Sequence, residues 1–155
     1  MTNTLTKIGG SITIVVAVAT AVLLPTPRES SAAVELQQKC ALAQAFHTSY
    51  VPVAAKKAGY PSMFFTIGEA ERPAWVAADY AKRGIGIADS LHTKKLAQDK
   101  NLFIAGKYTS RSSEHLLSGI IWEAIGPSFG ITTRWGGRFK KPDGNHYECG
   151  FKGEK

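Results

Sequence analysis

The chain has 155 residues, of which 44% are hydrophobic and 20% charged, and its formal net charge at pH 7 is +7. This length and composition fit one globular domain with an ordinary core, and the lack of repeats or low-complexity blocks excludes a solenoid or a disordered protein. The positive charge favours an anionic partner. Nucleic acid is a poor candidate, because no helix-turn-helix, zinc-finger or RNA-binding motif accompanies the scattered lysines.

Residues 1–33 have the features of a targeting segment and are not expected to belong to the domain. Lys7 precedes an apolar run over residues 8–24, Pro25 and Pro27 end that run, and Ser31-Ala32-Ala33 fits a cleavage site. We expect a cleavable signal peptide or, alternatively, a retained N-terminal membrane anchor; a mis-set initiation codon is the third alternative. Either of the first two places the domain outside the cytoplasm, periplasmic or extracellular, and favours the cell wall as the anionic partner. Contact with a membrane is expected only through this segment.

The remaining residues, 34–150, predict an α+β domain in which helices pack around a small antiparallel sheet. Hydrophobic periodicity and turn residues predict the following elements, in chain order: a helix over 34–57 that Pro52 breaks or kinks, a strand over 63–67, a helix over 73–84, a loop over 83–91, a strand over 96–103, a turn at 106–108, a helix over 113–125, and strands over 131–135 and from 146. Residues 151–155 are expected to form a short polar tail.

Two histidines and two aspartates form the one set of residues with an evident chemistry. His92 and Asp99 are seven residues apart, so on one continuous strand their side chains would point to opposite faces. They converge only if His92 lies in the loop before the strand that carries Asp99. Asp143-Gly144 is a turn dipeptide that leads to His146. A catalytic Zn²⁺ needs three such ligands and a nearby base, so we expect His92, Asp99 and His146 to hold zinc and Asp143 to act as the base.

We expect no metal-binding role for the other histidines, and we consider two alternatives for the two cysteines. His115 and His47 lie within predicted helices, and we do not expect either to bind the metal. Cys40 and Cys149 lie at opposite ends of the domain without C-x-x-C spacing, which argues against a structural zinc site. They form either a disulfide between the first helix and the last strand or two separate buried thiols.

At these residues the chain resembles the zinc peptidase family M15, which acts on peptidoglycan. The pattern Ser-x-His-x6-Asp with a distal acidic-x-x-His is typical of the family. The match is closer to its phage and prophage endolysin-like branch, and it covers roughly residues 43–150 in five blocks: Gly68 to Arg72, Ser90 to Phe103, Gly106 to Tyr108, Arg134 to Phe139, and Asp143 to His146.

The resemblance implies a Hedgehog/DD-peptidase-like fold and a zinc-dependent hydrolase, a monomer, that cleaves the L-alanyl-D-glutamate bond of the stem peptide. By the same resemblance, Arg72 would polarise the scissile carbonyl or hold a substrate carboxylate, and Ser90 would contact substrate. Trp135, before a glycine pair, is either an aromatic wall of the substrate groove or a core residue. The alternatives for function are a D-Ala-D-Ala carboxypeptidase and a non-catalytic peptidoglycan-binding domain of the same fold.

Two residues depart from the family pattern. Lys100 stands where an aliphatic strand residue is usual, and Lys95 stands where many relatives have glycine. Neither is a predicted ligand, so we expect the departures to affect local packing and substrate fit more than the metal.

Overall fold

The structure is a computed structural model that describes residues 31–150. Residues 1–30 of the predicted signal peptide or anchor, which was expected to span 1–33, and the tail 151–155 lie outside the described residues. The described part is α+β, as predicted, and its elements are α1 (Ala32–Lys57), β1 (Met63–Ile67), α2 (Ala74–Lys82), η1 (Leu91–Lys94), β2 (Ala97–Ile104), β3 (Lys107–Thr109), η2 (Ser112–His115), α3 (Leu116–Ile125), η3 (Gly126–Phe129), β4 (Thr132–Trp135), η4 (Gly136–Arg138) and β5 (His146–Gly150), where η marks a 3₁₀ turn.

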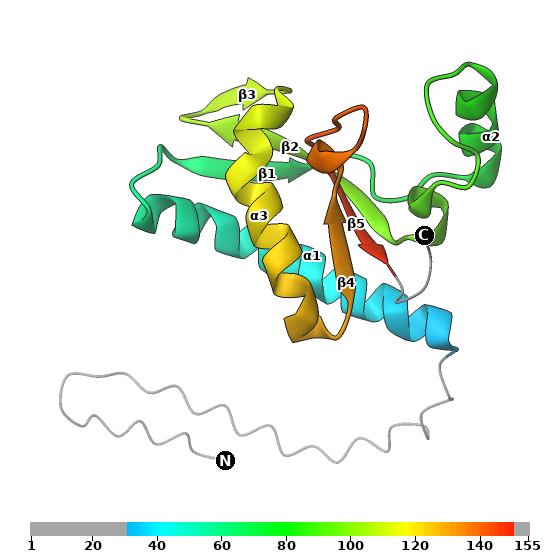
Figure 1. Cartoon of the computed structure of the whole chain (residues 1–155), viewed down its shortest axis with the longest axis horizontal. Helices are drawn as coiled ribbons and strands as arrows, with labels where there is room; N and C mark the ends of the chain where they lie inside the picture. Colours follow the sequence, from blue (N-terminus) through cyan, green and yellow to red (C-terminus); the bar gives the residue numbers. More distant parts are fainter. Residues whose placement is uncertain (1–30, 151–155) are drawn as a thin grey trace, which may run out of the picture.

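The sheet is antiparallel throughout, with the strand order β1-β2-β5-β4 and with β3 paired to the far end of β2. α1 and α3 cover one face, where His47 of α1 and Trp122 of α3 both pack against the ring of Tyr147 in β5. We call this the helical face; the opposite face is called the open face. Figure 1 shows α1 running along the sheet, while α2 lies apart at one end.

α1 begins earlier than predicted and is not broken at Pro52. It begins at Ala32, two residues before the expected domain boundary, because the side chain of Ser31 accepts a hydrogen bond from the backbone N–H of Val34. It also continues through Pro52 to Lys57, so of the two predicted alternatives, a break and a kink, the break is wrong. The buried neighbours Val51 and Ala55 pack in a core cluster with Leu102, and this packing outweighs the lost hydrogen bond.

The short strand β3 was not expected, because the sequence predicted only a turn there. Gly106, with φ of 78°, completes the reversal, and the three residues that follow pair with the end of β2. Lys95 also has a positive φ, of 57°, and ends the turn η1. This left-handed conformation favours glycine, which gives the physical reason why glycine is the easier residue at that position.

A disulfide joins Cys40 of α1 to Cys149 of β5, so the bridged alternative is the one found in the structure. The bridge spans 109 residues of sequence and lies in the main core cluster with Trp122, Trp135 and Tyr147. Closing a loop of this length removes much of the freedom of the unfolded chain, which the chain-entropy model values at about 4–5 kcal/mol. Within residues 31–150, no helix has the length and apolar character needed to cross a bilayer.

The core also contains a fully buried histidine, His47, whose Nε2 lies 2.9 Å from the carbonyl oxygen of Ser118. Burial, together with the positive charge of Lys100, lowers the pKa of His47 to about 3. The ordinary histidine pKa is about 6.5, so between about pH 6.5 and 3 His47 binds a proton in the unfolded chain but not in the folded chain.

We therefore expect His47 to weaken the fold as the pH falls from about 6.5 towards 3. The free energy of unfolding should lose up to about 1.4 kcal/mol per pH unit from this residue alone. Urea unfolding of wild type and His47→Phe at pH 7, 6, 5 and 4 measures it, because the variant lacks the titration and should gain on wild type with each step. A difference between the two proteins that does not change with pH would contradict the prediction.

Candidate metal centre

Three predicted ligands meet on the open face of the sheet. Asp99 of β2 and His146 of β5 are direct partners in the antiparallel ladder, so their side chains project side by side from the same face. His92 comes from η1, the turn before β2, as the sequence required. That turn is fixed by Ser90, whose hydroxyl accepts the N–H of His92, and by the hydrogen bond from the N–H of Leu96 to the carbonyl of Leu91.

The ligand atoms are spaced as a zinc ion requires. Nε2 of His92 lies 3.2 Å from Nδ1 of His146 and 3.3 Å from Oδ1 of Asp99, and the last two atoms are 3.1 Å apart. Zinc–nitrogen bonds of 2.0–2.1 Å in a tetrahedron separate neighbouring ligand atoms by about 3.3 Å. The three residues therefore fit a zinc ion, and among residues 31–150 they are the group of metal-binding side chains that converges in this way.

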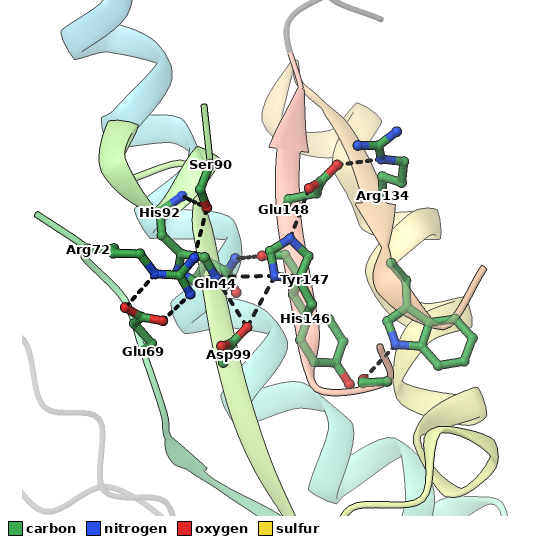
Figure 2. Close-up of polar contacts among 12 residues, drawn as sticks. Gln44, Glu69, Arg72, Ser90, His92, Asp99, Arg134, His146, Tyr147 and Glu148 are labelled. Atoms are coloured by element: carbon green, nitrogen blue, oxygen red, sulfur yellow. Dashed lines mark hydrogen bonds and ion pairs between the residues drawn. The ribbon is translucent and has the colours of Figure 1, made fainter. Parts of the chain in front are cut away.

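Glu148 orients one ligand from behind and was missed by the sequence analysis. Its Oε2 lies 2.9 Å from Nε2 of His146, and its other oxygen pairs with Arg134 of the neighbouring strand. Figure 2 shows Glu148 between the two side chains. Carboxylates in this position fix the ring orientation of a metal-binding histidine and raise its basicity. The sequence could have predicted this partner of His146, since Glu148 is two residues further along the same strand and must share its face of β5.

The two carboxylates also set the charge of the centre without metal. Burial opposes a charge on His146, but its hydrogen bonds to Asp99 and Glu148 outweigh burial and raise its pKa to about 9. Burial likewise opposes ionisation of Asp99, while the hydrogen bonds from His146 and His92 hold its pKa far below the usual range. Metal binding at neutral pH must therefore displace a proton from Nδ1 of His146.

Asp143 precedes His146 in a tight turn, and Gly136 makes that turn fit. The N–H of Asp143 donates to the carbonyl of Gly136, and the carbonyl of Asp143 accepts the N–H of His146. A Cβ on Gly136 would collide with the carbonyl of Asp143 and with Cβ of His146, so only glycine allows this approach. Desolvation of its carboxyl, although the residue as a whole is exposed, raises the pKa of Asp143 above its ordinary value.

Trp135 lies in the core and supports the same turn. Its side chain is 3% exposed, and its indole N–H donates to the carbonyl of Gly144 at 2.7 Å. Gly119 and Gly137 have no room for a Cβ because the indole occupies that space. The core alternative therefore describes Trp135 better than an exposed groove wall, and its contribution to the site passes through the turn.

Arg72 lies beside the ligands and is held by three groups. Glu69 accepts two hydrogen bonds, from Nε at 2.8 Å and from Nη2, and the ring of Tyr80 lies under the guanidinium at 4.9 Å. Nη1 is 3.4 Å from the hydroxyl of the buried Ser90. Figure 2 shows the carboxylate of Glu69 below the guanidinium. The hydrogen bond to Glu69 raises the pKa of Arg72, so the guanidinium is permanently charged.

The remaining histidines belong to the other side of the sheet. His115 and His47 are both buried on the helical face, where Nδ1 of His115 lies 3.1 Å from the hydroxyl of Tyr147. Glu69 and Tyr80 were not predicted as partners of Arg72. Glu69 could have been found, because it lies three residues from Arg72, but Tyr80 reaches the guanidinium from α2, which the sequence could not orient.

Comparison with known proteins supports the fold. No protein-family model matches the sequence, and no curated protein matches it significantly. Among solved structures, the chain is similar to a crystal structure of the Serratia marcescens L-Ala D-Glu endopeptidase ChiX, with a TM-score of 0.52 and 22% sequence identity. The alignment covers 58% of this chain and 69% of that chain. At this identity the similarity shows a shared fold.

We expect Glu148→Gln to weaken zinc binding by about 10–100-fold, because a neutral amide raises the basicity of His146 less than a carboxylate does. Competition with a chromogenic chelator measures the change in Kd. Glu35→Gln is the matched control: it removes an exposed carboxylate that pairs with Lys39 in α1, on the opposite side of the sheet from the ligands, and should leave the Kd unchanged. Equal affinities for Glu148→Gln and the control would contradict the assigned role.

Proposed function

We propose that this chain is a zinc-dependent peptidase that cleaves the stem peptide of peptidoglycan, at the L-Ala–D-Glu bond. The observation that carries the proposal is the convergence of one atom each from His92, Asp99 and His146 at mutual distances of 3.1–3.3 Å. The similarity to an L-Ala D-Glu endopeptidase structure supports the choice of substrate. We further propose, on the resemblance of the motifs, that the chain belongs to the M15 peptidases and acts after export.

In this mechanism zinc would supply Lewis acidity, lowering the pKa of a water and polarising the scissile carbonyl. Asp143 accepts the proton of the attacking water and later gives it to the leaving amine, and its raised pKa suits a group that must both take and return a proton. Gly136 and Trp135 keep Asp143 beside the ligands by holding the turn. Glu148 keeps the ring of His146 turned towards the metal position.

Arg72 could polarise the scissile carbonyl or hold a carboxylate of the substrate. Glu69 binds the Nε edge of the guanidinium, through Nε and one N–H of Nη2. The N–H groups on the Nη1 side remain, and Nη1 makes one long contact, to the hydroxyl of Ser90. Charged donors of this kind suit an oxygen on which negative charge develops during hydrolysis, and a parallel pair also suits a carboxylate. Ser90 would then act on the substrate through Arg72 and through the turn of His92.

We expect Asp143→Ala to lower the rate of peptidoglycan cleavage by about 10²–10⁴-fold while zinc still binds, because the residue handles the proton and is not a ligand. The measurement is muropeptide mass spectrometry on purified peptidoglycan incubated with the zinc-loaded chain, with the zinc content of each protein determined in parallel. Asp79→Ala is the matched control, since it removes an exposed aspartate of α2 that pairs with Arg83.

The products identify the reaction. New amino-terminal D-Glu that disappears in Asp143→Ala supports the endopeptidase, whereas released D-Ala would replace the proposed bond with that of a carboxypeptidase. Peptidoglycan that is bound but never cut by the zinc-loaded wild type would overturn the catalytic proposal. The non-catalytic binding domain would then be the correct description.

A further inference from the structure

A buried lysine lies directly behind the metal centre and takes no part in the proposed chemistry. Lys100 follows Asp99 on β2, so its side chain points to the helical face while Asp99 points to the open face. It is fully buried. Its Nζ lies 2.9 Å from Thr48 Oγ1, 2.9 Å from Nδ1 of His47 and 3.2 Å from the carbonyl oxygen of Gln44. These three acceptors, all from one turn of α1, match the three donors of an ammonium group.

The contacts of Lys100 continue to the strand of the other ligands. His47 bonds Ser118 of α3, and the hydroxyl of Ser118 lies 2.8 Å from that of Tyr147, the residue after His146. The side chain of Gln44 donates to the carbonyl of Tyr147 at 2.9 Å. The backbone N–H of Lys100 itself donates to the carbonyl of Asn145, the residue before His146. One network therefore holds both strands at the residues that flank Asp99 and His146.

The position of Lys100 combines a cost with contacts that compensate for it. Moving a charged ammonium out of water is costly. The three acceptors on α1 and the rings of Tyr147, Trp122 and Phe65, at 5.2–6.0 Å from Nζ, compensate for part of this cost. Buried polar networks of this kind also fix one arrangement of the elements that they join.

We propose that Lys100 is a positioning residue for the metal centre: its contacts to α1 hold β2 and β5 in the register and spacing that bring Asp99 and His146 to the ion. Metal sites require their ligands within about 0.5 Å of the productive geometry. A shift of β2 along or away from α1 moves Asp99 with it, because the two side chains leave adjacent residues of one strand. This inference rests on the proposed zinc centre.

The test compares zinc affinity with the stability of the metal-free protein. In Lys100→Met we expect the zinc Kd to rise about tenfold, as for other residues that orient ligands, and the Tm of the metal-free chain to fall, because three buried acceptors lose their donor. Leu102→Ala is the matched control, since it also lowers the Tm: Leu102 is fully buried on the same strand and the same face, but it does not adjoin a ligand. Its zinc Kd should equal that of wild type. Thr48→Val, which removes one acceptor and keeps the lysine, should raise the Kd about threefold.

An unchanged zinc Kd in folded Lys100→Met would overturn the inference. If Lys100→Met does not fold, Thr48→Val decides, and an unchanged Kd in that variant overturns the inference as well. Failure of the wild-type chain to bind zinc is a separate result, because it would overturn the metal centre itself. A Kd that rises in Lys100→Met and Thr48→Val but not in the equally destabilised Leu102→Ala is the outcome that a merely structural role of Lys100 would not give.

Discussion

The register between β2 and β5 is the constraint on which the rest of the site depends. Asp99 and His146 stand opposite each other in this ladder, and a slip of one residue would turn one of them to the helical face. The same register sends Lys100 and Tyr147 inwards, so that the residues that bind α1 and α3 alternate with the residues that would bind metal. The disulfide at Cys149 and the turn at Gly136 hold the two ends of β5 in this register.

The two faces of the sheet divide the chemistry. On the open face, carboxylates and histidines lie within hydrogen-bond distance of one another, and their mutual charges keep Asp99 ionised. On the helical face, Lys100 and His47 are buried among aromatic rings, and burial there opposes charge. The backbone of two strands, a few ångströms thick, separates these environments. A change on one face therefore reaches the other through the strand backbone.

The sequence predicted the fold class, and its motif spacing predicted the convergence of His92, Asp99 and His146. The placement of His92 before the strand and Asp99 within it followed from strand geometry alone. The sequence did not separate a break from a kink at Pro52, because local propensity could not anticipate how firmly Val51 and Ala55 pack. Tyr80 depends on the position of α2, and the contacts of Lys100 were not predicted because its three acceptors on α1 are more than fifty residues away in the chain.

The covalent link between Cys40 and Cys149 ties the state of the site to its redox surroundings. Cys149 lies three residues after His146, and Cys40 lies one helical turn before Gln44, which holds the backbone of β5. Thiol-reducing conditions would remove this covalent link and leave the last strand to its backbone pairing and its non-covalent contacts with α1 and α3. Disulfides form in oxidising compartments, so only there would the strand of His146, the third predicted ligand, be linked covalently to α1. The chain would then be synthesised in one compartment and acquire this link in another.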